Sequence, residues 1–475
     1  MTLIIAAILI VGFVLIATEK LTNVNKAAVA IFVGTLGWIL YVSFGMDYVT
    51  SQHPHEFTLF LNGAAATSAH VNEYIAHDIF LKYVGRAAEI VLFLLATMTI
   101  VEILQNNGCF DFIPQLMRTR SSKKLLWVVA ATTFVISANL DNLTTTVMML
   151  TIIRGVVRSR RQRVLLGGAV VISANVGGVL TVIGEPTGLV MWNSGFVTAT
   201  DYSLSMALPC LLAWAIPVWW IGRSLTGRAD LEWITMPYRG DDTNLNVWQR
   251  LVMLLVGIGG LWFIPTFHNI TKLSPFLGAL CVLSVLWVVN ELFNRKLMRT
   301  DDMIQRRTPR VLQYGVIQMM LFVMGIMLAL GVVKETGAFE QLMQFLAGTG
   351  FLGEDGFGIW GLGLLAGLAS TVLDNFATAM TFFSFHDVNI QEYITALHIP
   401  ALPNIYVQNG DYWKVVAYCV MVGGNLLTIG SMSGLALMKM ERMHVGWYFS
   451  NIGVKALVGG LVGLAALWVQ LELLV

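Results

Sequence analysis

Ten apolar segments in this chain are long enough to cross the hydrocarbon core of a bilayer, and they limit the fold to a membrane-spanning bundle. They lie near residues 2–18, 24–45, 86–106, 164–195, 204–223, 248–265, 273–293, 315–335, 413–438 and 447–471. Only 12% of the residues are charged, against about 25% in soluble domains. The segments are apolar throughout, whereas the strands of a membrane barrel alternate apolar and polar residues. The first segment lacks a basic flank and a small-residue cleavage site, so we expect an uncleaved helix.

A further apolar stretch at 125–153 cannot be a simple span. Basic residues crowd both of its ends: Arg118, Arg120, Lys123 and Lys124 before it, then Arg154, Arg158, Arg160, Arg161 and Arg163. Because loops rich in Lys and Arg remain in the cytoplasm, both ends are expected there. A segment that begins and ends on one side must enter the membrane and return, so the pattern predicts a re-entrant hairpin.

The stretch 357–384 has the opposite flanks. Acidic residues surround it, namely Glu354, Asp355, Asp387, Glu392 and Asp411, and predict a second hairpin that enters from outside. The basic run at 295–310 predicts a cytoplasmic loop, and 46–85 reads as an outer loop. The remaining spans then alternate, with both termini outside.

The two hairpins are related in sequence. Ser137-Ala-Asn-Leu-Asp141-Asn142-Leu-Thr-Thr145 aligns without a gap on Ser370-Thr-Val-Leu-Asp374-Asn375-Phe-Ala-Thr378. Farther on, GGVLTVIG at 177–184 aligns with GGNLLTIG at 423–430. Five spans in each half, an odd number, give the halves opposite orientations, an architecture typical of secondary transporters.

We therefore expect an all-α polytopic membrane protein made of two inverted repeats. The first repeat is 1–223, with its hairpin at 125–153 and a broken helix at 164–195. A polar cytoplasmic linker at 224–247 precedes the second repeat, 248–475, with its hairpin at 357–384 and a broken helix at 413–438.

Each hairpin carries an acid where a charge costs several kcal/mol, about 2.5–3.5 on insertion scales. In helical register Ser137, Asp141 and Thr145 share one face, and Ser370, Asp374 and Thr378 repeat the pattern. With Asn142 and Asn375 beside them, these groups offer oxygen ligands for a hard cation. The alternative is that each acid only caps the inner helix of its hairpin.

Glycines and Pro186 interrupt two otherwise continuous spans, and the freed carbonyl groups need partners. Polar residues near the breaks are candidate ligands: Asn175, Glu185 and Thr187 in the first, and Asn425, Thr428, Ser431 and Ser433 in the second. Glu89, Glu102 and Lys455 are possible accessory residues. Lys455 could pair with a site carboxylate, relay protons or extend toward an interface.

Several function classes find no support. The chain has no Walker A sequence, no HExxH and no CxxC pair, so ATP-driven pumping and metal-dependent enzyme chemistry are unsupported. Its four scattered cysteines have no metal-site spacing, and a net charge of +1 offers nucleic acid no electrostatic attraction. We expect no enzyme activity and no cofactor.

At these motifs the chain resembles the NhaD-type sodium/proton antiporters, within a superfamily that includes arsenite and di- and tricarboxylate permeases. The resemblance is most specific in EIVLFLLATMTIVEIL (89–104), SANLDNLTTTVMM (137–149), NVGGVLTVIGEPTGLVMW (175–192), STVLDNFATAM (370–380) and GGNLLTIGS (423–431). It implies efflux of sodium or lithium driven by proton entry across the cytoplasmic (inner) membrane, with Asp141, Asn142, Asn175, Asp374 and Asn375 at the site. It also implies a homodimer with a scaffold and a moving transport domain. Two residues depart from the pattern: Glu185 where a shorter Asp is expected, and Asn425 where Ser is expected.

The main alternative is an arsenite or carboxylate permease. Carboxylate transporters of this superfamily carry Ser-Asn-Thr at the hairpin tips, whereas Asp stands in place of Ser in both hairpins here. A carboxylate site repels a carboxylate substrate and favours a cation. A channel or a membrane enzyme is the other alternative.

The expected mechanism is competition. An isolated Asp ionises too far below neutral pH to exchange protons in the cytoplasm, but burial and a second nearby carboxylate both disfavour the charged form. Sodium would then expel protons from Asp141 and Asp374, and protons would expel sodium.

Overall fold

The computed structural model describes residues 1–22, 24–225, 227–231, 245–295, 316–348, 357–386 and 406–473. Within these ranges all regular elements are helices, and nine of the helices are long and apolar enough to cross a membrane. This confirms the prediction of an all-α polytopic membrane protein. The predicted linker core at 232–244, most of the basic run at 295–310, and the flanks of the second hairpin at 349–356 and 387–405 lie outside the described residues.

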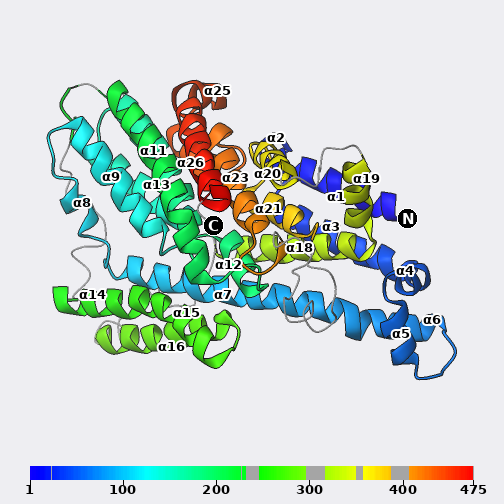
Figure 1. Cartoon of the computed structure of the whole chain (residues 1–475). Coiled ribbons are helices and arrows are strands. Elements are labelled where there is room, and N and C mark those ends of the chain that lie inside the picture. Colours follow the sequence, from blue (N-terminus) through cyan, green and yellow to red (C-terminus); the bar gives the residue numbers. More distant parts are fainter. Residues whose placement is uncertain are drawn as a thin grey trace.

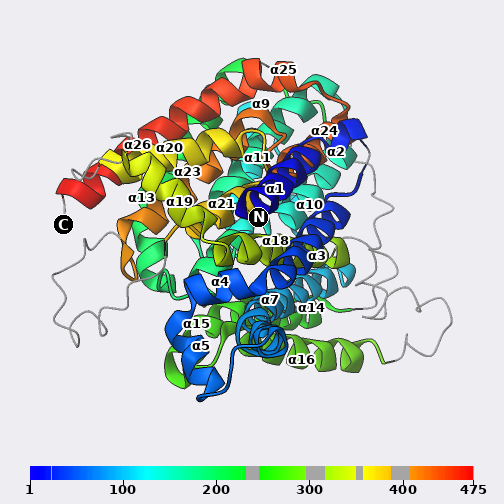
Figure 2. The same cartoon turned by 90° about the vertical axis from the view of Figure 1, so that its right-hand side faces the viewer.

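One layer of the molecule is built around a long central helix, α7, which packs against α16 on one side and α18 on the other. α18 packs on α3, and α3 on α1. Figure 2 shows α7 nearly end-on between α18 and α16. We call this group the α7 layer: α1 (Thr2–Ala17), α3 (Lys26–Ser43), α7 (Leu81–Asn106), α14 (Val247–Leu254), η2 (Leu255–Gly259), α15 (Gly260–Thr271), α16 (Pro275–Phe293) and α18 (Val316–Glu335).

Most of the remaining helices form a second layer, which lies above α7 in Figure 1, as do α1, α3 and α18 of the first layer. Here α11 packs on α9, α10, α13 and α23, while α23 packs on α20, α21 and α26. We call it the hairpin layer: α9 (Ser122–Ser137), α10 (Asn142–Val156), α11 (Arg160–Leu180), α12 (Pro186–Asn193), α13 (Ala199–Ser224), α20 (Phe357–Ser370), α21 (Asn375–Phe383), α23 (Asp411–Leu427), α24 (Met432–Glu441), α25 (Val445–Tyr448), η6 (Phe449–Gly453) and α26 (Val454–Leu473). Among the described helices, the main contacts between the two layers are those of α12 with α7 and of α21 with α18.

The core of the hairpin layer is α11. In its most apolar 18-residue window 89% of the residues are buried, against 33% in α16 of the other layer. Peripheral helices instead expose large apolar side chains such as Leu204 of α13 and Trp262 of α15, as expected for surfaces that face lipid. Helix α11 therefore carries its residues into the interior of the protein, away from lipid.

The first apolar segment, expected near 2–18, forms α1 (Thr2–Ala17), a helix of 16 residues. One prediction farther along the chain needs correction. The predicted outer loop at 46–85 is helical: α4 (Gly45–Gln52), α5 (Pro54–Leu61), α6 (Ser68–Tyr74) and η1 (Ile75–Phe80) lead into α7. Buried residues in this segment recur with helical spacing at Val71, Ile75 and Ile79, and this period decides the structure. The loop prediction counted charges and missed that period.

A small polar cluster ties this helical segment to the end of α18. His53 Nε2 lies 2.7 Å from Glu335 Oε2, and the Tyr83 hydroxyl donates to Glu335 Oε1 at 2.6 Å. His53 Nδ1 also lies 3.3 Å from Glu56 Oε2. The hydrogen bond to Glu335 raises the pKa of His53, and partial burial of the ring opposes that rise.

This cluster predicts a pH-dependent stability. The pKa of His53 in the folded protein lies above the unfolded value of about 6.5, so its contribution is complete below that pH and is lost as pH rises through the folded-state pKa. His53→Gln should remove this component, which thermal unfolding of purified protein across a pH series will measure. His55→Gln, at an exposed neighbouring position, is the control. Equal pH dependence of the melting temperature in wild type and His53→Gln would contradict the prediction.

The first helical pair predicts a labelling pattern. If α9 and α10 form a re-entrant hairpin, single cysteines at Lys124 and Arg161, both exposed, should react with an impermeant thiol reagent from the cytoplasmic side alone. Because native Cys281 is exposed, the background should carry Cys281→Ser. Labelling of the two positions from opposite sides would instead make the pair a span.

Candidate functional site

The first hairpin turns at Asp141. Helix α9 ends at Ser137, and Asp141 is the N-cap of α10. Its Oδ2 accepts hydrogen bonds from Thr144 N at 2.9 Å and from Thr144 Oγ1 at 3.1 Å. A carboxylate is stable here because the first backbone N–H groups of a helix lack partners and the helix dipole favours negative charge. The capping role that we weighed as an alternative is therefore present, and it holds the acid inside the protein.

The second hairpin repeats this turn with different neighbours. Asp374 is the N-cap of α21, and its Oδ1 accepts from Phe376 N at 3.0 Å. Ser370 Oγ donates to Asn375 Oδ1 at 2.7 Å, and Asn375 N donates to the Gly430 carbonyl at 3.0 Å. The tip of this hairpin is thus hydrogen-bonded to the break between α23 and α24.

Both predicted helix breaks are present. Helix α11 ends at Leu180 and α12 begins at Pro186 with Glu185 as its N-cap, while α23 ends at Leu427 and α24 begins at Met432 with Ser431 as its N-cap. Four helices therefore start beside one another inside the protein, three of them at an acidic residue.

The contacts around the breaks repeat between the two halves. Each of three glycines near the first break contacts a residue of the first hairpin. The glycine 246 residues later contacts the residue 233 residues later, in the second hairpin. A Cβ atom on any of these glycines would press on the residue that it contacts. The pairs are Gly177 with Phe134 and Gly423 with Gly367, Gly178 with Asn142 and Gly424 with Asn375, and Gly184 with Ser137 and Gly430 with Ser370. Ser137 Oγ donates to the Ala174 carbonyl at 2.6 Å, and Ser370 Oγ lies 2.9 Å from the equivalent Val420 carbonyl. The sequence repeat is thus also a repeat of contacts.

Glu185 is the carboxylate that faces both hairpins. It is 7% exposed, feels the charges of Asp141 and Asp374, and interacts with the side-chain amides of Asn142 and Asn375. Sequence analysis placed Glu185 among the ligands but expected the two Asp side chains to influence each other directly. In the structure Glu185 links them. No group of three or more His, Cys, Asp and Glu among the described residues is close enough to hold a metal ion together.

Asparagine side chains connect the halves. Asn142 Nδ2 points to Asn175 Oδ1 at 3.5 Å, and Asn175 Nδ2 donates to Asn425 Oδ1 at 2.9 Å. Asn175 and Asn425 sit on α11 and α23, near their last turns. The structure thus brings together the first hairpin and both broken helices through amides.

Several hydroxyl groups near this network have no protein partner. Within the described ranges, the Oγ1 atoms of Thr145, Thr187 and Thr378 are buried and accept or donate no hydrogen bond. Thr145 and Thr378 are equivalent positions of the two hairpins. The other hydroxyl candidates are engaged: Ser431 Oγ accepts from Gly434 N at 3.0 Å, Ser433 Oγ donates to the Asn142 carbonyl at 3.3 Å, and Thr428 Oγ1 contacts Met438 Sδ at 2.8 Å.

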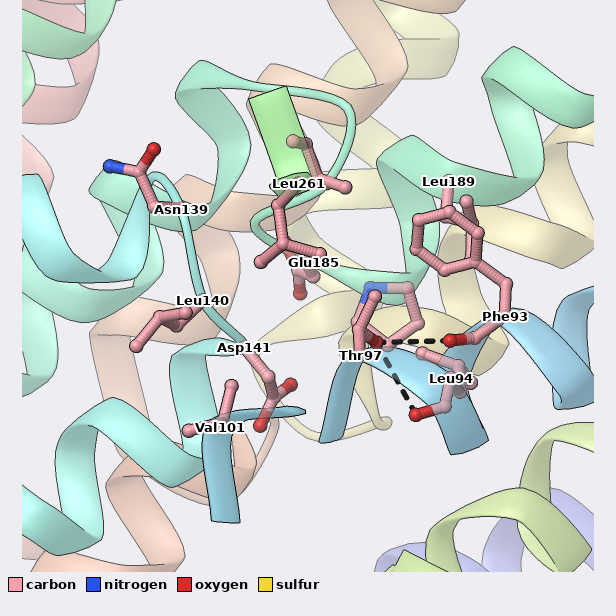
Figure 3. Close-up of a pocket in the computed structure, with 12 residues that line it drawn as sticks. Phe93, Leu94, Thr97, Val101, Asn139, Leu140, Asp141, Glu185, Leu189 and Leu261 are labelled. Carbon is pink, nitrogen blue, oxygen red and sulfur yellow. Dashed lines mark hydrogen bonds between the residues drawn. The ribbon is translucent and has the colours of Figure 1, made fainter. Parts of the chain in front are cut away.

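A small cavity separates the first hairpin from α7. Figure 3 shows Asp141 and Glu185 on this cavity, with Thr97 and Phe93 of α7 opposite them. Its volume of about 10 Å³ is close to the space that a single water molecule needs. The cavity therefore lies at the contact between the two layers and has room for one small particle.

A basic residue that sequence analysis did not consider reaches the second hairpin. Lys26 Nζ lies 2.8 Å from Asp374 Oδ2, and the side chains of Lys26 and Asp374 are 16% and 9% exposed. Lys26 falls inside the predicted span 24–45. A lysine within an apolar segment is the sequence signal that could have identified it as a candidate site residue. In the part of the chain that the structure describes, Asp141 and Glu185 form no ion pair.

The possible accessory residues lie apart from the hairpin tips. Glu89 Oε2 accepts from Asn193 Nδ2 at 2.8 Å and from Ser274 Oγ at 3.2 Å, and so joins α7, α12 and the start of α16. Lys455 donates to Ser224 Oγ at 3.2 Å at the end of α13, rather than to a site carboxylate. Glu102 is on α7 beside Val101, which lines the cavity.

Comparison with known proteins agrees with this architecture. A family model described as a citrate transporter (CitMHS) matches residues 13–402. Among the relatives are sodium/proton antiporter 2 of Arabidopsis thaliana, 26% identical over 96% of both chains, and the Na(+)/H(+) antiporter NhaD of Alkalimonas amylolytica, 23% identical over 93% of this chain and 84% of the relative. Sodium/proton antiporter 1 of Arabidopsis thaliana is 30% identical over 80% of this chain, a match that spans 62% of that protein. The resemblance to NhaD-type proteins is thereby confirmed, and so is the expectation of a transporter rather than an enzyme. This chain belongs to the citrate transporter (CitMHS) family of multi-pass membrane transporters.

Proposed function

We propose that this protein is a sodium/proton antiporter that exports cytoplasmic sodium or lithium in exchange for protons from outside. The observation that carries the proposal is the position of three acids, the buried Glu185 and Asp374 and the partly exposed Asp141, at helix starts around one asparagine network. Acids with carboxamide and hydroxyl oxygens nearby suit a hard cation. The relatives named as sodium/proton antiporters support the same substrate.

Citrate or another polycarboxylate is disfavoured as the substrate. Three acids face the site and one lysine, Lys26, reaches it. A carboxylate approaching the cavity beside Asp141 and Glu185 would meet two like charges, which is costly in a medium of low dielectric constant. The description of the family as citrate transporters therefore agrees with the fold, but citrate does not agree with the acidic residues at the site.

In the proposed cycle, sodium and protons compete for the same carboxylate oxygens. A sodium ion at Asp141 or Asp374 favours the ionised acid, and a proton neutralises the acid and weakens its hold on sodium. The asparagines and the unpartnered Thr145 and Thr378 hydroxyls would complete the coordination. Movement of the hairpin layer against the α7 layer would expose the site to each side in turn. We further propose that the protein works as a homodimer in the inner membrane.

Replacement of either hairpin acid should abolish exchange. Asp141→Asn and Asp374→Asn should each reduce sodium-dependent proton movement in everted vesicles to background, because an amide cannot exchange a proton for a cation. Asp111→Asn is a control, because Asp111 is a half-buried acid that pairs with Arg250 at 3.0 Å in another part of the chain. Near-wild-type exchange in both single variants, at equal protein levels, would refute the proposed site.

Competition predicts a pH-dependent sodium affinity. In proteoliposomes, half-saturating sodium should rise about tenfold per pH unit below the controlling pKa for one competing proton, and should level off at higher pH. Two coupled acids would make half-saturating sodium depend more steeply on pH, and the apparent pKa values would then belong to the pair of acids and not to either residue. A half-saturation value that stays constant from acidic to alkaline pH would show that protons use a different route from sodium.

A further inference from the structure

Lys26 occupies an unusual place for a lysine. It is the first residue of α3 in the α7 layer, and its ammonium group crosses to Asp374 of the hairpin layer. The same ammonium lies 4.2 Å from the centroid of the Phe322 ring, which is fully buried on α18. The Phe322 ring makes an edge contact with Phe376 of α21. The ion pair therefore sits where α18 meets α21, one of the contacts between the layers.

The pair breaks the symmetry of the two hairpins. Asp141 and Asp374 occupy equivalent turns and cap equivalent helices. Of these two acids, only Asp374 has a cationic partner among the described residues. A purely structural acid would need the same compensation at both positions, because a buried charge is costly wherever it lies. The lysine must therefore be explained by something particular to the second hairpin.

An ammonium group and a sodium ion place the same demand on Asp374. Each is a small cation that binds carboxylate oxygen, and Lys26 already holds Oδ2 at 2.8 Å while Phe376 N donates to Oδ1. Both oxygens thus have a partner, and a second cation at Oδ2 would lie beside the like charge of the ammonium, so sodium binding there favours withdrawal of Lys26. The flexible stem of lysine makes withdrawal feasible, and its strong hydration favours release where water can enter.

We propose that Lys26 is a tethered cation that competes with sodium for Asp374, so that sodium binding releases the hairpin layer from the α7 layer. This inference rests on the proposed antiport. In the ion-free protein Lys26 neutralises Asp374 and ties the two layers together. When sodium takes its place, that tie is broken and the loaded hairpin layer is free to move. Lys26 is thus a positioning residue that acts through Asp374.

The test uses two substitutions with opposite expected effects. Lys26→Gln removes the competitor and should lower half-saturating sodium about tenfold, the factor that 1.4 kcal/mol provides. Lys26→Arg strengthens the competitor, because a guanidinium can grip a carboxylate with two parallel hydrogen bonds, and should raise half-saturating sodium. Both are measured at one fixed alkaline pH, as sodium-dependent stabilisation of purified protein and as transport in proteoliposomes.

Lys414→Gln is the matched control. Lys414 is also buried and pairs with Asp201 at the same 2.8 Å, but both residues belong to the hairpin layer. Its removal should leave half-saturating sodium at the wild-type value. A sodium affinity equal to wild type in both Lys26 variants would overturn the inference, as would an equal gain in Lys414→Gln.

A second measurement needs no variant. Sodium should increase the rate at which an amine-reactive reagent modifies Lys26, read by mass spectrometry, and should leave Lys414 unchanged. An unaltered Lys26 rate at saturating sodium would overturn the inference even if Lys26→Gln fails to fold. If the wild-type protein neither binds nor exchanges sodium, the proposed function itself fails; if it exchanges sodium and the Lys26 results are negative, only the inference fails.

Discussion

Helix ends inside a membrane protein must find partners for their free N–H and C=O groups, because no surrounding water is available. Four helices of this protein begin together in its interior, and three of them begin at an acidic residue, Asp141, Glu185 or Asp374. The Asp141 and Asp374 side chains accept hydrogen bonds from the free N–H groups of their helices, which satisfies the backbone and keeps these carboxylates where they would otherwise be too costly, whereas the Glu185 side chain makes no such bond. Capping and ion binding are therefore not competing explanations of these acids. The capping hydrogen bonds lower the free-energy cost of placing a carboxylate inside the protein, and the carboxylate places an ionisable group at the start of the helix.

The packing of the protein interior depends on glycine residues as well as on charged side chains. At each break a helix passes close against the opposing hairpin, so that side chains larger than hydrogen would press on backbone carbonyls or on Asn142 and Asn375. These close contacts hold each hairpin tip against its broken helix as a unit. Between the layers, by contrast, the described contacts are fewer: α12 on α7, α21 on α18, and side-chain bridges such as Asn193 with Glu89. Tight packing within one layer and sparse bonding between layers is the arrangement that relative movement of two rigid groups requires.

Much of this organisation could be predicted from sequence, because the signals were local. Paired glycines and Pro186 located the helix breaks, and the repeated Ser, Asp, Asn and Thr located the hairpin turns. The central role of Glu185 was harder to predict from sequence, because its interactions with both hairpins form only when the two halves of the protein pack together. The pairing of Lys26 with Asp374 joins residues 348 positions apart, and no local pattern encodes it. The helices at 45–80 were missed for another reason: their charges suggested a loop, while the helical spacing of Val71, Ile75 and Ile79 was the stronger signal.

The unequal caps of the two broken helices have an electrical consequence. Glu185 begins α12, whereas its counterpart Ser431 begins α24 and carries no charge. With all groups ionised, the first hairpin and its break hold two negative charges from Asp141 and Glu185, while Asp374 and Lys26 cancel at the second. An ancestral pair of identical halves would have offered a cation two equivalent wells. Here, with these groups ionised, a cation meets unequal charge at the two breaks, so the repeated backbone does not give two equivalent binding sites.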